Sequence, residues 1–300
     1  MIHRATSSRQ KGMAVIGALL VVAAASVATA GIMERQSMLA DTLAGERDRA
    51  QARWLLRGGL DWARILLFND ARSNAITLRS AIWAQPISGL EMRDPQSGRS
   101  AWFSGLIEDE QGKYNLRRLA ANGSVQGAEL AALQRLLTGL GAPHHLAGTI
   151  AGRVAAAQPG PQQAASAAHL RTLHDLAGID GLGLETLAML ADYLTLLPGN
   201  TAVNVNTATP EVLSAVIPGL GLAHARALTG ERDRGQWFNS RGDFLNRLDM
   251  PGLKTEIALD VRSEWFKVTG EVALEHARAR MQALLHRPGE TPPAIRWIED

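Results

Sequence analysis

The chain has 300 residues, enough for one large or two small domains, and 46% of them are apolar while 20% are charged. It contains no cysteine, so disulfide bonds, thiol catalysis and cysteine-ligated metal sites are excluded. The pI of about 9.3 suits a nucleic-acid-binding protein. Removal of residues 1–12, however, would take Arg4, Arg9 and Lys11 away and change the formal net charge from +2 to −1, which weakens that interpretation.

One long apolar stretch dominates the N-terminal region. Residues 12–33 carry no charged side chain, only positive charges precede them, and Glu34 and Arg35 follow. As a helix, residues 13–33 would span about 30 Å, the thickness of a bilayer core. The charge asymmetry places the short leader in the cytoplasm and the rest across the membrane. Three interpretations remain open: a secretory signal cleaved at Ala-Thr-Ala (residues 28–30), an uncleaved anchor, or a leader removed after Gly12.

The sequence around Gly12 favours the third interpretation. Residues 9–13 read Arg-Gln-Lys-Gly-Met, which resembles the prepilin leader of type IV pilins and type II secretion pseudopilins. The resemblance implies cleavage between Gly12 and Met13, methylation of the new N-terminus, and an apolar helix that anchors the subunit and then forms the assembly core. Most pilins carry a glutamate five residues into the mature chain, which pairs with the N-terminal amine of the next subunit. This chain has Gly17 there, as in the minor pseudopilin K (GspK) family, whose members cap the tip.

Helical periodicity continues past the apolar stretch. It predicts one helix over residues 13–69, with its first part in lipid and its second part packed on a folded domain. Two helices joined near Glu34 are the alternative. The tryptophans at Trp54, Trp62 and Trp83 are expected to be packing anchors rather than ligand-stacking residues.

Short β-like segments flank a helical region. Alternating apolar residues predict strands over residues 100–109, 114–116, 266–275 and 294–298. Residues 109–113 (Asp-Glu-Gln-Gly-Lys) are expected to form a solvated turn rather than a metal or acid–base site. Residues 277–287 fit a helix or a strand by pattern, and the resemblance to GspK favours a strand that completes a C-terminal hairpin.

Residues 117–250 are rich in alanine and leucine and are predicted to be mostly helical. Gly-Leu-Gly triplets at 139–141, 181–183 and 219–221 suggest related helix-hairpin-helix units, because glycine accepts the positive φ of a tight hairpin. Helices are expected on both sides of each triplet, over residues 128–138, 146–156, 170–177, 185–197, 211–216 and 223–232.

The third unit is the best formed, with its hairpin at Pro218, Gly219, Leu220 and Gly221. The sequence VNVNTATPEVLSAVIPGLGLAHARAL resembles two families. One is the helix-hairpin-helix of DNA-uptake and repair proteins, in which hairpin amides hold a phosphate. The other is the helical domain of GspK, in which the motif is a scaffold. Acidic residues are interleaved with the nearby arginines, so DNA binding is the less favoured interpretation.

The sequence contains no constellation that indicates catalysis. It lacks the HExxH, GxSxG and P-loop motifs, and the adjacent His144 and His145 would diverge on a helix. We therefore predict no enzyme activity, no cofactor and no metal ligands. Some GspK-type proteins bind calcium in a loop after the first helical unit. Residues 150–174 contain no Asp or Glu here, which argues against calcium in that loop.

Taken in order, these features resemble the GspK family over nearly the whole chain. The resemblance implies an α+β, pilin-like fold, in which a long N-terminal helix packs on an antiparallel sheet and an all-α domain with SAM-like helix-hairpin-helix units is inserted. The expected divisions are a prepilin leader (1–12), a transmembrane part of the helix (13–33), the first part of the pilin-like domain (34–116), the helical insertion (117–250) and the C-terminal strands (251–300).

The implied function is that of a minor pseudopilin of the type II secretion system. Such a subunit would cap the periplasmic pseudopilus, which pushes folded exoproteins through the outer-membrane secretin. Expected partners are the I and J minor pseudopilins, the major pseudopilin, the prepilin peptidase and the inner membrane, with the secretin and exoproteins as further candidates. The expected location is a single pass in the inner membrane with the bulk in the periplasm. The alternative is a membrane-tethered helix-hairpin-helix protein for DNA uptake.

Overall fold

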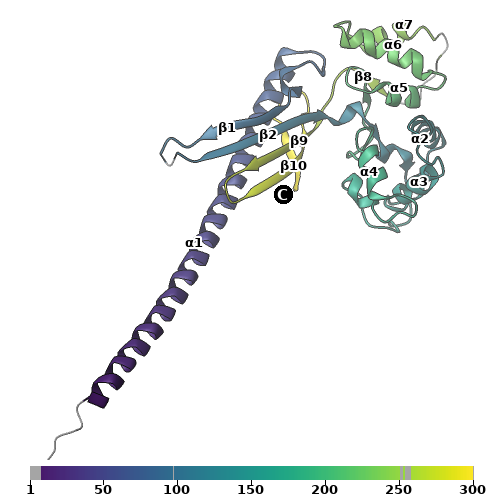
Figure 1. Ribbon diagram of the computed structural model, residues 1–300. Coiled ribbons are helices and arrows are strands. Elements are labelled where there is room, and N and C mark those ends of the chain that lie inside the picture. Colours follow the sequence, from purple (N-terminus) through teal and green to yellow (C-terminus); the bar gives the residue numbers. More distant parts are fainter. Residues whose placement is uncertain (1–7, 97, 251–252, 254–257, 300) are drawn as a thin grey trace, which may run out of the picture.

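A single helix forms the N-terminal quarter of the computed structural model, which describes residues 8–96, 98–250, 253 and 258–299. Helix α1 runs from Ser8 to Ser73 without a break (Figure 1). The predicted continuous helix over residues 13–69 is confirmed, and the alternative of two helices joined near Glu34 is wrong. Residues 1–7 of the predicted leader lie outside the described residues.

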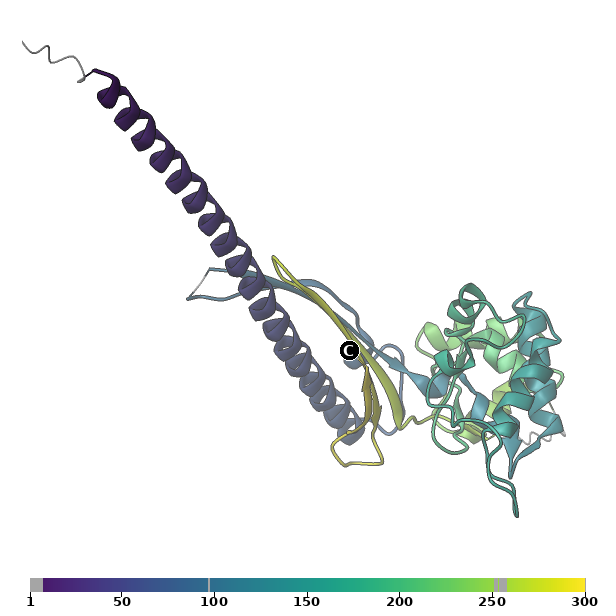
Figure 2. The ribbon, with the colours of Figure 1, turned by 90° about the horizontal axis from the view of Figure 1, so that it is seen from below.

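Five antiparallel strands form the sheet that packs on this helix. They are β1 (Ile87–Arg93), β2 (Ser100–Asp109), β9 (Trp265–Ala273), β10 (Arg278–His286) and β11 (Ala294–Glu299), in the spatial order β1-β2-β9-β10-β11. The predicted strands over 100–109, 266–275, 277–287 and 294–298 are therefore confirmed. Figure 2 shows the sheet lying along the C-terminal part of α1 only.

The core of this unit lies between α1 and one face of the sheet. Leu56, Leu60 and Leu67 of α1 are buried against Phe266 and Val272 of β9, among other strand residues. Burial of a large apolar side chain contributes about 1.5–3 kcal/mol, so this contact fixes the sheet on the helix.

The three tryptophans have different outcomes. Trp83, in the short 3-10 helix η1 (Ile82–Ala84), is buried and packs edge-on against Phe266 at 5.1 Å between ring centroids, as expected. Trp54 is 70% exposed, so its expected role as a packing anchor is wrong, whereas Trp62 is 47% exposed and lines the space between α1 and the sheet. Helical geometry explains the error, because Trp54 lies about 200° around the helix from the buried Leu56.

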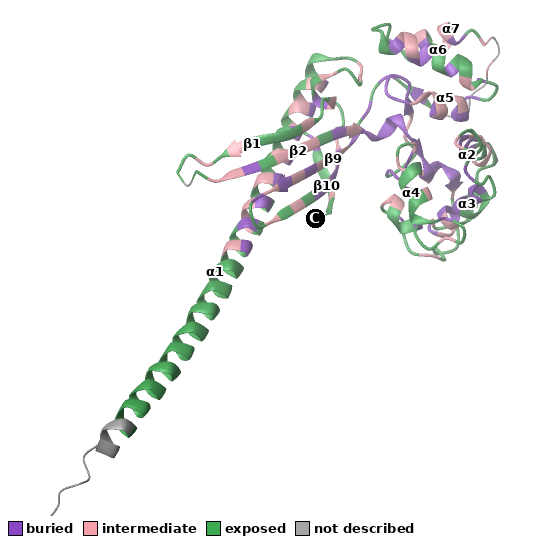
Figure 3. Cartoon of the chain, viewed as in Figure 1, coloured by how far each residue is buried: buried purple, intermediate pink, exposed green. Residues whose placement is uncertain are grey.

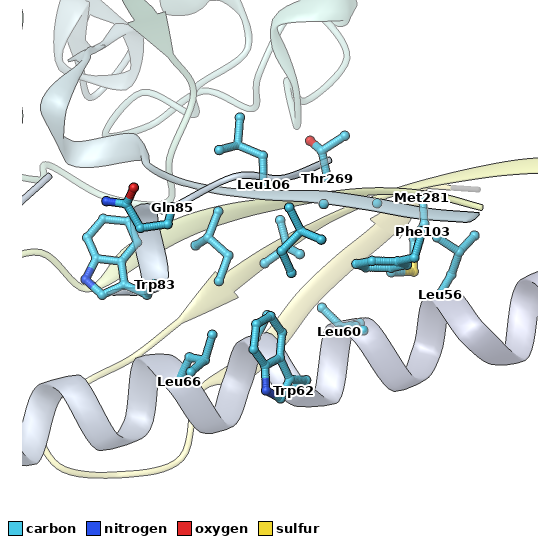
Figure 4. Close-up of a pocket in the computed structure, with 17 residues that line it drawn as sticks. Leu56, Leu60, Trp62, Leu66, Trp83, Gln85, Phe103, Leu106, Thr269 and Met281 are labelled. Atoms are coloured by element: carbon cyan, nitrogen blue, oxygen red, sulfur yellow. The ribbon is translucent and has the colours of Figure 1, made fainter. Parts of the chain in front are cut away.

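Gly59 allows α1 and the sheet to approach closely. A Cβ atom on Gly59 would stand 2.7 Å from Cζ of Phe103, which reaches from β2 toward the helix above Leu56 (Figure 4). The space left among the side chains drawn there is about 30 Å³, roughly the volume of one water molecule. This contact is therefore close packing rather than a ligand pocket.

A mostly helical unit occupies the chain between β2 and β9, at the end of the molecule farthest from the N-terminal part of α1 (Figure 1). Its helices are α2 (Gly127–Gly139), α3 (Leu146–Ala156), α4 (Leu184–Leu190), α5 (Pro210–Val216), α6 (Leu222–Asp233) and α7 (Arg241–Leu248). It has its own core, which includes the fully buried Leu133, Ile150 and Phe238. We call this unit, residues 110–264, the insertion.

Short strands and 3-10 helices complete the insertion. The strands are β3 (Tyr114–Asn115), β4 (Ala120–Ala121), β5 (Ser124–Val125), β6 (Leu194–Thr195), β7 (Val203–Asn204) and β8 (Leu259–Asp260). The 3-10 helices are η2 (Glu110–Gly112), η3 (Leu116–Leu119) and η4 (Leu173–Leu176). Strand β8 pairs in parallel with β7, so the chain beyond the predicted boundary at residue 250 still contacts the insertion.

The strand predicted over residues 114–116 is present as β3, which pairs in parallel with β6. Two helix predictions in this region are wrong. The helix predicted over residues 185–197 ends at Leu190, because Leu194 and Thr195 form β6 instead. The helix predicted over residues 170–177 is reduced to η4. In each case a long-range backbone pairing or a turn outweighed a helical apolar pattern.

Candidate functional site

The N-terminal half of α1 has no partner within the part of the chain that the structure describes. None of the most apolar 18-residue window of this helix is buried, and Figure 3 shows the exposed stretch projecting from the folded unit. It is also the helix among the described residues that is long and apolar enough to cross a membrane. So much apolar surface is stable only in lipid or against other helices.

The polar side chains in this stretch are satisfied inside the helix. Ser26 Oγ donates to the Val22 carbonyl oxygen at 2.9 Å, and Thr29 Oγ1 donates to that of Ala25 at 2.8 Å. Both hydroxyl groups therefore meet their hydrogen-bonding needs without water, which is what a bilayer requires.

The predicted processing residues lie at the start of this exposed helix. The described helix runs through Gly12 and Met13 without interruption, and the Met13 side chain is 74% exposed. At Gly17, apart from its chain neighbours and the nearby backbone of its own helix, no heavy atom of the described residues lies within 4 Å of where a Cβ atom would stand. A glutamate would therefore fit at position 17, and lack of space is not what keeps it out.

The predicted hairpin at Pro218, Gly219, Leu220 and Gly221 joins α5 to α6. Gly219 has a φ of +84°, and Gly221 is the N-cap of α6. Leu220 between them is buried, and its carbonyl oxygen accepts a hydrogen bond from Ser214 Oγ at 2.8 Å. The hairpin therefore needs glycine at Gly219 for backbone geometry, while Leu220 anchors it in the core.

Two of the three Gly-Leu-Gly triplets share this geometry. In the second, Gly181 has a φ of +78°, Leu182 is buried and Gly183 is the N-cap of α4. In the first triplet the positive φ, +70°, falls on Gly141, directly after the end of α2. That arrangement ends a helix rather than repeating the hairpin.

A buried carboxylate joins the sheet to the insertion. Asp109, the last residue of β2, accepts hydrogen bonds at Oδ2 from Ser263 Oγ (2.6 Å), Asn204 Nδ2 (3.1 Å) and Thr207 Oγ1. Its Oδ1 accepts from the Gln111 backbone nitrogen at 2.8 Å. Burial raises the pKa of the Asp109 carboxyl above its ordinary value, and these hydrogen bonds oppose the rise. We call the group around Asp109 the junction.

The predicted solvated turn at residues 109–113 is therefore wrong. Asp109, Glu110, Gln111 and Lys113 are each 9% exposed or less. The chain that covers them is the VNVNT segment and the return to β9, which lie 95 and 154 residues away along the sequence at Asn204 and Ser263. An acidic turn resembles a surface turn until these distant donors are known.

The asparagines of the VNVNT segment hold backbone in place. Asn206 Nδ2 donates to the Phe238 carbonyl oxygen at 2.8 Å, and the Phe238 nitrogen donates to Asn206 Oδ1 at 2.9 Å. Asn204 Oδ1 accepts from the Asn206 nitrogen at 2.9 Å. These polar side chains are buried inside the insertion, which fits a scaffold rather than a ligand-binding surface.

Arg287 extends the junction to α1. Its Nη1 donates to Asp70 Oδ2 at 2.9 Å and to the Leu67 carbonyl oxygen at 3.0 Å. Its Nη2 donates to Thr77 Oγ1 at 3.1 Å and to the Ser263 carbonyl oxygen at 3.0 Å. One buried guanidinium therefore connects the end of α1, the end of β10 and the chain returning from the insertion.

A charged group on the opposite face of the sheet also crosses this boundary. Lys267 Nζ of β9 lies 2.9 Å from Glu108 Oε2 and 3.6 Å from Glu110 Oε1, and Lys113 Nζ lies 2.8 Å from Glu110 Oε1 and 3.5 Å from Glu108 Oε1. Thr195 Oγ1 of β6 donates to Glu110 Oε2. Burial alone would lower the pKa of Lys267, but Glu110 and Glu108 raise it to about 12. The insertion is thus fixed to the sheet on both faces.

Asp48 fixes the other end of the sheet to α1. Both of its carboxylate oxygens lie 2.7 Å from Arg99 Nη2, and Oδ2 accepts from the His276 nitrogen at 3.2 Å. These partners belong to the loops that join β1 to β2 and β9 to β10. Burial alone would raise the pKa of Asp48, but the hydrogen bonds from Arg99 and His276 hold it below its ordinary value.

The described residues offer no assembled metal centre. No group of three or more His, Asp or Glu side chains among them could hold a metal ion. Arg232, one of the arginines near the predicted hairpin, is buried and donates to the carbonyl oxygens of Val205 and Ala208 at 3.0 and 2.7 Å. It serves the fold and is not available to a DNA phosphate.

Comparisons with known proteins converge on one family. The sequence model of "Type II secretion system (T2SS), protein K" matches residues 203–269. Proteins named type II secretion system protein K are similar over nearly their whole lengths. The one from Pseudomonas aeruginosa is 27% identical, covering 93% of this chain and 89% of the relative, and the one from Klebsiella pneumoniae is 28% identical, covering 97% and 99%.

A solved structure shares the fold. A chain of the GspK-GspI-GspJ complex from enterotoxigenic Escherichia coli superposes with a TM-score of 0.66 at 17% identity, covering 85% of this chain and 97% of that chain. The match confirms the predicted mixed fold, in which a long N-terminal helix lies against an antiparallel sheet.

Proposed function

We propose that this chain, a homologue of type II secretion system protein K, is a minor pseudopilin that caps the tip of a periplasmic pseudopilus. The comparisons confirm the predicted resemblance to the GspK family. The main observation behind the proposal is that the exposed apolar half of α1 continues into the part of the helix that packs on the sheet. A subunit with so much exposed apolar surface needs lipid, and then other helices, around it.

The proposed partners are other minor pseudopilins of the I and J types. The structural neighbour was solved as a complex of GspK with GspI and GspJ, and the fold of this chain matches it. The exposed apolar face of α1 supports helix-to-helix packing with such subunits. The major pseudopilin, the prepilin peptidase and the inner membrane are proposed as further partners.

Tip placement has two proposed physical causes. Gly17 offers no carboxylate to neutralise the N-terminal amine of a neighbouring subunit, although the position has room for one. The insertion, which we propose to be a scaffold with SAM-like helix-hairpin-helix units, lies at the end farthest from the N-terminal part of α1, where it would prevent another subunit from stacking above. The proposed role needs no metal or cofactor.

Intact-mass and N-terminal sequence analysis of the protein from membranes tests the processing step. A chain beginning at N-methylated Met13 is expected, with its helix in the inner membrane and its bulk in the periplasm. A chain beginning at Gly31 would overturn the proposal, since the protein would then have lost the apolar helix on which assembly depends.

Two variants test the tip placement. Gly17→Glu and deletion of residues 117–250 remove the two proposed causes, and Gly31→Glu is a matched control at another open glycine of the same helix. Immunolabelling of sheared pseudopili should show the first two variants along the filament and the control at the tip. If both variants stay at the tip, this account of capping is wrong.

A further inference from the structure

Three arginines and a histidine meet in a cleft between the insertion and the sheet. Arg117, His169, Arg171 and Arg296 line a space of about 360 Å³. Its walls include Leu197, Leu284 and Trp297, from the loop after β6 and from strands β10 and β11. We call this space the arginine cleft. It shares no residue with the junction.

The lining of the arginine cleft contains no acidic residue. None of its three arginines makes an ion pair with a carboxylate of the described chain. Arg117 Nη2 instead lies 3.3 Å from His169 Nε2, and Arg296 Nη2 lies 2.8 Å from His286 Nδ1. The positive charges of the three arginines are therefore close together in the cleft, and no carboxylate of the described chain neutralises them.

Asp175 interacts electrostatically with Arg171, but its carboxylate already accepts hydrogen bonds from the backbone. Its Oδ2 accepts from the backbone nitrogens of Arg171 and Thr172 at 2.6 and 2.9 Å. It caps η4 in this way and does not line the cleft.

Two buried N–H groups strengthen the argument. Arg117 Nε and Trp297 Nε1 are buried and have no hydrogen-bond partner among the described residues. Burial also lowers the pKa of Arg117, with no acidic neighbour opposing it. Unpaired buried donors are rare because they are costly, so two in the lining of one cationic cleft indicate a missing acceptor.

We infer that the arginine cleft binds a carboxylate presented by a polypeptide partner. Guanidinium groups match the two oxygens of a carboxylate, and the leucine and tryptophan walls suit apolar residues next to it. The choice of a polypeptide rests on the proposed function, in which the chain acts by assembly. The carboxylate can come from an Asp or Glu side chain or from a chain terminus.

The sequence around the cleft has the charge that this role requires. Residues 150–174, which contain no Asp or Glu, contribute His169 to the cleft, and Arg171 lies in the same stretch. The same stretch cannot supply the carboxylate ligands that a calcium site needs. Because these residues include no Asp or Glu, they provide no calcium ligands, and they also leave the positive field in the cleft unopposed.

The test uses the full chain in detergent micelles and three probes. The first is a leucine-flanked Glu-Asp-Glu peptide with an amidated C-terminus, the second a leucine-rich peptide with a free C-terminal carboxylate and no acidic side chain, and the third inorganic phosphate. Tryptophan fluorescence and calorimetry measure binding at several salt concentrations. The variants are Arg171→Glu and Arg296→Glu, with Arg278→Glu as a control on the exposed start of β10.

At least one peptide should bind saturably, weaken as salt rises, and lose tenfold or more in affinity in each cleft variant but not in Arg278→Glu. Binding of the first peptide alone identifies a side-chain carboxylate, and binding of the second alone identifies a terminus. No binding, equal binding by all variants, or phosphate binding as tightly as the peptides would overturn the inference. Each result is independent of the N-terminal processing that tests the proposed function.

Discussion

Replacing Gly59 with alanine should destabilise the protein, although alanine favours the helical conformation. A Cβ atom there would stand 2.7 Å from Cζ and 2.8 Å from Cε2 of Phe103. The same ring also packs close to Gly105, where a Cβ atom would stand 2.9 Å from Cε1, and this limits how far the ring can move away. At the neighbouring Gly58, nothing in the described structure lies within 4 Å of the same atom.

The expected size follows from two opposing effects. Alanine gains about 1 kcal/mol over glycine within a helix, and this gain applies at both positions. Overpacking a core contact costs about 1–3 kcal/mol, and this cost applies at Gly59 alone. Gly58→Ala should therefore stabilise the protein by up to about 1 kcal/mol, and Gly59→Ala should lie about 1–3 kcal/mol below it.

Equilibrium urea unfolding of the full chain in detergent, followed by tryptophan fluorescence, measures both free energies of unfolding. The double variant Gly59→Ala, Phe103→Leu should recover stability relative to the sum of the single changes, because the smaller side chain makes room for the new methyl group. If Gly59→Ala stabilises the protein as much as Gly58→Ala does, the close contact between α1 and the sheet is wrong.

Three further substitutions test the hairpin and the polar contacts. Gly219→Ala should lower the free energy of unfolding by about 1–2 kcal/mol because its φ is +84°, whereas Gly221→Ala, at −68°, should cost less in thermal unfolding, because alanine is only a poorer N-cap than glycine there. Asp48→Asn should lower the urea midpoint at pH 7, and the difference from wild type should shrink as the pH falls below 3.8, since a lowered carboxyl pKa stabilises the fold only while the group is ionised. Arg287→Lys should cost about 1–3 kcal/mol, because lysine cannot reach four acceptors, while Arg278→Lys at the exposed start of β10 should not change stability.

The sequence predicted those elements whose burial is one-sided and regular. Strand β9 alternates buried and half-buried residues from Phe266 to Ala273, and that alternation is visible in the sequence itself. Helix α1 was predictable for the same reason. Trp54 shows the limit of this reasoning, because the sequence alone does not distinguish an apolar residue that stays exposed from one that packs within its own chain.

The junction could not be predicted, because its parts are far apart in the chain. Asp109 looks like the start of a surface turn, and its donors Asn204 and Ser263 lie 95 and 154 residues away. The alternation of valine and asparagine in VNVNT was the one feature of the sequence that could have indicated buried polar contacts. Both valines and both asparagines prove to be buried, so the asparagines had to find internal partners.

These contacts bear on how force would pass along the chain in the proposed tip position. The chain crosses from sheet to insertion at Asp109 and returns near Ser263, and two strands of backbone alone would form a hinge. Hydrogen bonds are directional, so those of Asp109 and Arg287 fix the angle of the insertion as well as its distance. A push along α1 would then reach the insertion through Asp70 and Arg287 without bending at the crossing, which apolar contacts alone would not ensure.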